Sequence, residues 1–122
     1  MVHKRQILIV DDQSDLRKLI RMTLEPLGCD LHEAENGLAA LSLVRSVKPE
    51  VVILDAMMPG GVDGYQVCQA IKSDPQTRRI KVIMVTARGQ KTDIEEGQRV
   101  MADCYLVKPF SPLRLIEEVE SA

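Results

Sequence analysis

The chain has 122 residues, a net charge of −2 and 45% apolar residues, which fits one ordinary domain with a packed core. The slightly acidic charge argues against a surface that binds nucleic acid directly, because such surfaces are usually basic. No apolar run approaches the length of a membrane span, and the short apolar stretch near the N-terminus lacks a cleavage site, so we expect no membrane contact and a cytoplasmic location.

Apolar runs of strand length alternate with stretches of helical spacing along the whole chain. Strands are predicted at Ile7–Val10, Cys29–Glu33, Val51–Leu54, Val82–Val85 and Cys104–Val107. The first, third and fourth runs are continuous and rich in Val and Ile, which is typical of strands buried on both faces. The helical stripes that follow the strands are Leu16, Ile20, Leu24 and Leu27; Leu41, Val44 and Val47; Val67 and Ile71; Ile94 and Met101; and Leu113, Ile116 and Val119.

Signals for helix ends agree with these stripes. Asn36, Asp63 and Ser111 stand at predicted N-caps, and Ser111 is followed by a proline that suits the first helical position. Pro26, just before Gly28, suits the end of the first helix. The strict alternation of strand and helix predicts an α/β fold with a doubly wound, five-stranded parallel sheet.

The three cysteines, Cys29, Cys68 and Cys104, lie far apart in the sequence. Their odd number and the lack of a CxxC pair argue against a disulfide framework or a zinc site. Each lies among apolar residues, so we expect three buried free thiols.

Polar residues stand where the predicted strands end. Asp11 and Asp12 follow the first strand, Asp55 the third, Thr86 the fourth and Lys108 the fifth. In open parallel sheets, ligands bind beyond the carboxyl ends of the strands. The sequence therefore predicts that these residues converge on one edge of the sheet.

Three carboxylates at one edge repel one another, by roughly 3 kcal/mol per pair at about 5 Å and an effective dielectric near 20. A hard divalent cation would offset this repulsion, and carboxylate oxygens without histidine or cysteine favour Mg²⁺. Lys108 adds a fixed positive charge. A cation, a lysine and a hydroxyl around a free carboxylate suit a phosphoryl group, and the carboxylate itself can act as the nucleophile.

Each of these residues also has an ordinary structural explanation. An Asp-Asp pair after a strand usually belongs to a loop or caps a helix, and Asp55 alone suits a turn. Thr86 alone suits a helix cap, and Lys108 alone suits a solvated surface. The joint placement of all of them at strand ends favours a site.

The motifs "VDD", "LDAMMPG", "TA" and "KPF", after the first, third, fourth and fifth strands, resemble those of a response-regulator receiver domain of two-component signalling. The resemblance covers the whole chain. It implies a flavodoxin-like fold with strand order 2-1-3-4-5. It also implies a phosphoacceptor without enzymatic turnover of an external substrate, apart from self-phosphorylation and self-dephosphorylation assisted by Mg²⁺ or, in its place, Mn²⁺.

The resemblance also implies a role for each matching residue. Asp55 would accept the phosphoryl group from a phosphohistidine of a sensor kinase or a phosphotransfer protein. Asp12, Asp55 and the backbone carbonyl of Met57 would bind Mg²⁺ directly, and Asp11 would do so through water. Lys108, with a cis bond to Pro109, would hold the phosphoryl oxygens. Thr86 and Tyr105 would form the switch that responds to phosphorylation.

The chain departs from the family pattern in one loop, "MMPGGVDGY", which is one residue longer than usual between Pro59 and Gly64. We expect it to reshape the entrance to the site without removing a functional residue.

Three other functions remain as alternatives. A phosphatase of the haloacid-dehalogenase type would need a second aspartate where Met57 stands. A flavin-binding module would need an uncharged phosphate loop in place of "DDQSD". A receiver-like module that binds partners without phosphorylation would not need the complete acidic set.

For the domain organisation we expect a single receiver domain over residues 1–122, without an output domain in this chain. The expected contact surface for a downstream protein or output domain is the face formed by the fourth helix, the fifth strand and the fifth helix. Arg99, Tyr105 and Arg114 are its predicted members, and the same face would suit a homodimer.

Overall fold

The protein is described from a computed structural model that covers residues 4–87 and 91–122, with the side chains of residues 91–94 left out. Strands and helices alternate within these residues as the sequence predicts. The strands are β1 (Gln6–Val10), β2 (Asp30–Ala34), β3 (Val51–Asp55), β4 (Lys81–Thr86) and β5 (Cys104–Val107). The helices are α1 (Ser14–Leu24), the short 3₁₀ helix η1 (Glu25–Leu27), α2 (Gly37–Val47), α3 (Gly64–Ser73), α4 (Lys91–Arg99) and α5 (Pro112–Glu120).

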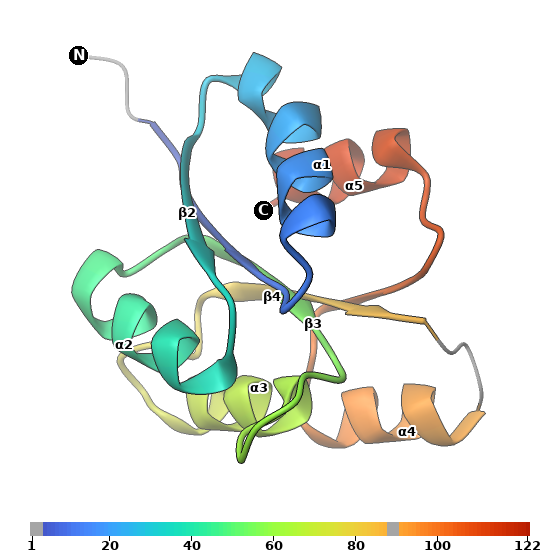
Figure 1. Cartoon of the computed structure of the whole chain (residues 1–122). Helices are drawn as coiled ribbons and strands as arrows, with labels where there is room; N and C mark the ends of the chain where they lie inside the picture. Colours follow the sequence, from blue (N-terminus) through green and yellow to red (C-terminus); the bar gives the residue numbers. More distant parts are fainter. Residues whose placement is uncertain (1–3, 88–90) are drawn as a thin grey trace.

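The strands form one parallel sheet in the order β2-β1-β3-β4-β5. Helices α1 and α5 cover one face, and α2, α3 and α4 cover the other (Figure 1). This is the doubly wound α/β fold with the predicted strand order. The strand register pairs Val10 with Leu54, Asp55 with Val85, and Thr86 with Val107. The site residues predicted at the strand ends follow these paired residues in the sequence, so they meet at one edge of the sheet.

The central strands are buried on both faces. All five residues of β3 are buried, and alternate residues of β1 pack into different cores. Leu8 packs on the side of α2, α3 and α4, whereas Ile7 and Ile9 pack on the side of α1 and α5. Two apolar layers thus hold the sheet from either side, which explains why these strands read as continuous apolar runs.

The predicted helix starts are confirmed. The side chain of Asn36 accepts a hydrogen bond from the Ala39 N–H, and Ser111 accepts one from the Arg114 N–H. Asp63 forms a reciprocal capping box with Gln66 at the start of α3. Each cap satisfies a backbone donor that would otherwise lack a partner within the helix.

The first helix ends as expected, through a turn of 3₁₀ helix that contains Pro26. Gly28 closes this turn with a φ of 74°, in the left-handed region that glycine adopts without steric cost. The chain then enters β2, which begins one residue later than predicted.

Three predictions about packing were wrong. Met101 lies beyond the end of α4 with a φ of 67°, and it is 67% exposed. In α5, Leu113 is 63% exposed, and Leu115 takes the buried place instead. Of the three free cysteines, only Cys68 is buried, whereas Cys29 and Cys104 are half-buried. The side chain of Ile94, the other residue of the predicted α4 stripe, lies outside the described residues.

Candidate phosphoacceptor site

The predicted site residues come together at the carboxyl edge of the sheet. A pocket of about 290 Å³ opens there between the ends of β1, β3, β4 and β5. Its lining contains the predicted residues Asp12, Asp55, Thr86 and Lys108. Residues separated by most of the chain thus share one small volume. The complete lining is Asp12, Gln13, Asp55, Met57, Thr86, Ala87 and Lys108.

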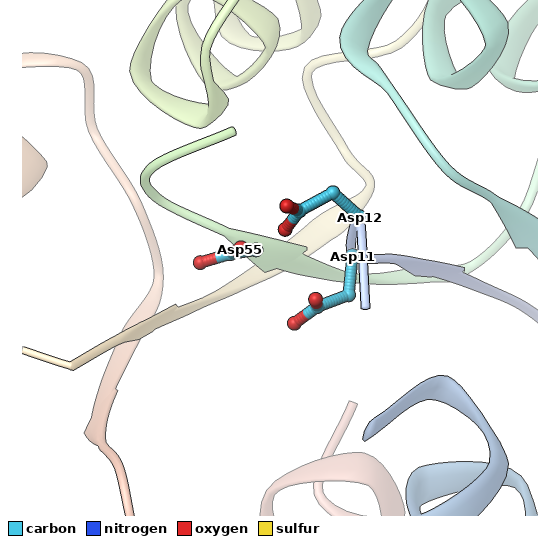
Figure 2. Close-up of side chains that lie close together, drawn as sticks. All are labelled: Asp11, Asp12 and Asp55. Carbon is cyan, nitrogen blue, oxygen red and sulfur yellow. The ribbon is translucent and has the colours of Figure 1, made fainter. Parts of the chain in front are cut away.

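Three carboxylates form an acidic cluster at this edge. Asp11, Asp12 and Asp55 each offer one oxygen, and these oxygens lie within 4.8 Å of one another. Figure 2 shows the carboxylates of Asp11 and Asp12 turned toward the side where Asp55 lies, at the neighbouring ends of β1 and β3. Asp11 and Asp55 are buried, at 2% and 6% exposure, whereas Asp12 is exposed. The cluster is therefore a set of hard oxygen donors that is open to solvent on one side, and this set suits a Mg²⁺ ion that keeps several waters.

Lys108 brings a positive charge to the buried side of the cluster. Its Nζ lies 3.2 Å from an oxygen of Asp11 and 3.6 Å from an oxygen of Asp55. The backbone N–H of Lys108 donates to the carbonyl of Thr86 at 2.6 Å, which fixes the end of β5 beside β4. The bond from Lys108 to Pro109 is cis, as the family resemblance implies.

The surroundings of Asp55 disfavour the ionised form of its carboxyl group. Burial and then the negative charge of Asp11 raise the pKa of the Asp55 carboxyl from 3.8 to about 6. Lys108 and the N–H of Met57, which donates to Asp55 at 3.4 Å, act in the opposite direction and lower this pKa. Near neutral pH the group is still mostly ionised, and it is poorly solvated. This is the condition in which a carboxylate gains from a nearby cation.

The turn after Asp55 packs α3 against the site. A side-chain carbon at Gly64 would overlap the carbonyl oxygen of Asp55, and the Gly64 N–H donates to the carbonyl of Ala56 at 3.0 Å. Glycine is therefore required sterically at the first residue of α3. The side chain of Met57 is 58% exposed, and the predicted role of its backbone carbonyl stays a prediction.

The long loop between Pro59 and Gly64 lies against the start of α2. A Cβ on Gly37 would lie 2.6 Å from the carbonyl oxygen of Val62, so the loop and the helix touch at backbone distance. Gly60 has a φ of 102°, which a side chain would make costly. The loop thus lies beside the site without contributing a residue to the pocket lining.

The two predicted switch residues differ in their relation to the pocket. Thr86 is buried, at 1% exposure, and lines the pocket. Tyr105 is half-buried on β5, outside the pocket lining, and packs against the core on the side of α2, α3 and α4. Its hydroxyl lies 2.9 Å from the hydroxyl of Tyr65.

The structure adds two supporting residues that sequence reasoning missed. Arg17 in α1 donates to the carbonyl of Asp11 at 2.6 Å and pairs with Glu33 of β2 at 3.0 Å. The N–H of Gln13 donates to the Asp11 carboxylate at 2.8 Å. Arg17 stands off the apolar stripe of its helix, which is also where a solvated arginine would stand. The sequence around Arg17 therefore contains no signal that indicates this role.

The described helices include none that is both long and apolar enough to cross a membrane.

Comparison with known proteins agrees with this architecture. The family model "response regulator receiver domain" matches residues 7–120. The chain is 44% identical to a probable transcriptional regulator, ycf27, of Guillardia theta over 92% of its own length and 42% of that protein. It is 38% identical to the phosphate regulon transcriptional regulatory protein PhoB of Pseudomonas aeruginosa, over 96% of its own length and 51% of that protein. The chain thus spans about half the length of the curated relatives it matches.

A solved structure shows the same fold across almost the whole chain. The chemotaxis protein CheY4 of Vibrio cholerae superposes with a TM-score of 0.89 at 28% identity, over 98% of either chain. The family model, the relatives and the strand order agree. The chain belongs to the response regulator receiver domains of two-component signalling.

Proposed function

We propose that this receiver domain accepts a phosphoryl group on Asp55 from a phosphohistidine of a sensor histidine kinase or a histidine phosphotransfer protein. The change at Asp55 then alters the conformation through Thr86 and Tyr105 and so controls a partner or an output domain. One observation carries the proposal: Asp55 is a buried carboxylate that faces a pocket, belongs to the acidic cluster and lies 3.6 Å from the ammonium group of Lys108.

In the proposed step, an oxygen of Asp55 forms a bond to phosphorus while the bond from phosphorus to the donor's imidazole nitrogen breaks. The electron pair of that bond stays on the nitrogen, which then binds a proton. Lys108, 3.6 Å from Asp55, is placed to hold the phosphoryl oxygens, and the Thr86 hydroxyl would bind another oxygen of the group. Such positioning and charge stabilisation account for most of the catalysis in phosphoryl transfer.

Asp12, Asp55 and the backbone carbonyl of Met57 would hold Mg²⁺, with Asp11 acting through water, and Mn²⁺ would substitute. When bound, the ion neutralises negative charge on the phosphoryl oxygens. The fit rests on the donor set, since three carboxylate oxygens within 4.8 Å suit a hard cation and no soft ligand is among them. The domain would not turn over an external substrate, as is general for receiver domains. Formation and loss of its own acyl phosphate are part of the proposal.

The proposal is tested by incubating the protein with acetyl phosphate and Mg²⁺ and measuring its mass. We expect a gain of one phosphate that is lost in Asp55→Asn and when the metal is chelated. Asp15→Asn is the matched control, because Asp15 is an exposed acid in the first turn of α1, outside the cluster. It should gain phosphate as the unmodified protein does.

Absence of the mass gain in the unmodified protein, with the fold intact, would favour the alternative of an interaction module that works without phosphorylation. Phosphate retained in Asp55→Asn would move the acceptor to another residue. Membership in the receiver family already favours the proposal over a dehalogenase-type phosphatase or a flavin module.

The proposed contact surface is the α4-β5-α5 face. Two of its predicted members form ion pairs within their own helices, Arg99 with Glu96 and Arg114 with Glu118. Val107 is 42% exposed there. Such a surface suits a downstream protein, an output domain or a homodimer. A single receiver domain over residues 1–122, a cytoplasmic location, and no direct nucleic-acid contact by this domain are parts of the same proposal.

A further inference from the structure

The chain contains two tyrosines and no tryptophan, and the fold brings the two tyrosines into contact. Tyr65, the second residue of α3, is 8% exposed and its hydroxyl lies 2.9 Å from that of Tyr105 on β5. One hydroxyl donates and the other accepts, because a phenol does both. Helix α3 and strand β5, 40 residues apart at this point, are therefore joined by a polar contact at the border of an aliphatic core.

Helix α4 makes room for the ring of Tyr105. Gly97 is buried in α4, and a Cβ built on it would overlap the ring atoms Cε2 and Cδ2 of Tyr105. The ring thus occupies the space that any other residue at position 97 would fill. Glycine inside a helix is unfavourable relative to alanine, so its presence here fits the close approach of the ring.

We infer that Tyr65 is a positioning residue for Tyr105. Together, the Tyr65 hydroxyl and the space at Gly97 form a seat that holds the Tyr105 ring against α3 and α4 before any phosphoryl group is present. We call this placement the inward position of the ring. We call this pair of contacts the Tyr105 seat.

A consequence for signalling follows, and it rests on the proposed function. If the phosphorylated form favours the inward ring, the seat stabilises in advance the conformation that phosphorylation selects. By linkage, a change that empties the seat must then weaken binding of a phosphoryl analogue by the factor by which it lowers the population of the inward ring. A hydrogen bond of ordinary net strength corresponds to about a three- to tenfold change in such an equilibrium.

The first test needs neither metal nor phosphate. Tyrosine labelled with ¹³C in the ring gives two sets of NMR signals in the unmodified protein, and Tyr65→Phe leaves those of Tyr105 alone. We expect the Tyr105 signals to shift or broaden as the ring populates a second position. Tyr105 signals that stay in place in Tyr65→Phe would overturn the inference.

Gly97→Ala tests the other half of the seat. We expect it to displace the signals of both tyrosines in the unmodified background. In a Tyr105→Ala background the same substitution should be neutral or stabilising, because the ring that it meets is gone. An equal loss of stability in both backgrounds would show that Gly97 serves only the helix.

The second test measures the affinity for beryllofluoride with Mg²⁺. Tyr65→Phe and Tyr105→Phe should each weaken it, by up to about tenfold, and the double variant should lose less than the sum of both losses, because they share one hydrogen bond. Saturating beryllofluoride should return the Tyr105 signals of Tyr65→Phe toward those of the unmodified protein. Losses that add fully, or an unchanged affinity, would contradict the coupling.

Failure of the seat and failure of the proposed function are distinguishable. If the unmodified protein does not bind beryllofluoride, the phosphoacceptor proposal fails, whereas the metal-free NMR test still decides whether Tyr65 positions Tyr105.

Discussion

Asp12 and Asp55 belong to one acidic cluster and differ in their surroundings. Asp55 is 6% exposed and lies beside Lys108, whereas Asp12 faces solvent at the rim of the pocket. A cation from solvent can reach an exposed carboxylate directly. A buried carboxylate is restrained by its neighbours, which hold it in position for reaction. Two residues of the same type are thus suited to different tasks by their burial alone.

Asp12→Asn is expected to raise the melting temperature of the metal-free protein by a few degrees. The substitution removes one of the mutually repelling charges without a large change in volume, and the effect should shrink at high salt because the charge is exposed. Thermal unfolding in a chelator at low ionic strength measures it. Asp15→Asn removes a charge outside the cluster and serves as the control. An unchanged or lowered midpoint for Asp12→Asn would contradict a repulsive cluster.

The raised pKa of Asp55 predicts a pH-dependent stability. The folded form binds a proton on Asp55 up to about pH 6, whereas the unfolded chain loses it near 3.8. The stabilisation is therefore complete below about pH 4 and is lost as the pH rises through 6. The difference in unfolding free energy between Asp55→Asn and the unmodified protein, without metal, should grow by about 3 kcal/mol over this window. A difference that is flat with pH would show that Asp55 titrates normally.

At the scale of the element, α5 shows how helical spacing misleads when two leucines stand two positions apart. Leu113, on the predicted stripe, is 63% exposed, and Leu115 is completely buried against α1 and the sheet. The true stripe combines Leu115 with Val119, one turn apart. The rotation of α5 about its own axis decides between the two, and α5 packs against both the sheet and α1.

These two leucines form a matched pair for measuring core energetics. Leu115→Ala should lower the unfolding free energy by about 2–5 kcal/mol, because it leaves a cavity in the core. Leu113→Ala should change it by less than about 0.5 kcal/mol, as is usual for exposed positions. Denaturant unfolding of both variants compares them in the same helix with the same chemical change. Similar losses would mean that α5 lies on the sheet at a different rotation.

At the scale of the whole molecule, the acidic cluster links folding to metal binding. The cluster exists only when β1 and β3 lie side by side, so a cation that binds there stabilises the folded state alone. The same assembly creates repulsion when no cation is bound. The site thus lowers stability in one condition and raises it in another.

Mg²⁺ is expected to stabilise the protein by about 2.7 kcal/mol when its free concentration is one hundred times its dissociation constant. Mn²⁺ should act in the same way. The measurement is the shift in the unfolding midpoint at constant ionic strength, with NaCl as the control. Asp12→Asn and Asp55→Asn should lose most of this shift, so that the metal reverses their stability order relative to the unmodified protein. A shift of equal size in Asp55→Asn would indicate that the ion binds elsewhere.

The strands and helices, the fold class and the residues at the strand ends could all be predicted from the sequence. Apolar periodicity and caps such as Asn36 and Asp63 act within a few residues, so their signals are local and readable. The burial of Asp55, the rotation of α5 and the contact between Tyr65 and Tyr105 could be seen only in the folded molecule. The strand ends predicted that Lys108 and Asp11 share one edge of the sheet, but not that their side chains lie 3.2 Å apart across 97 residues of sequence. Such contacts depend on how whole layers pack, and no local pattern encodes that.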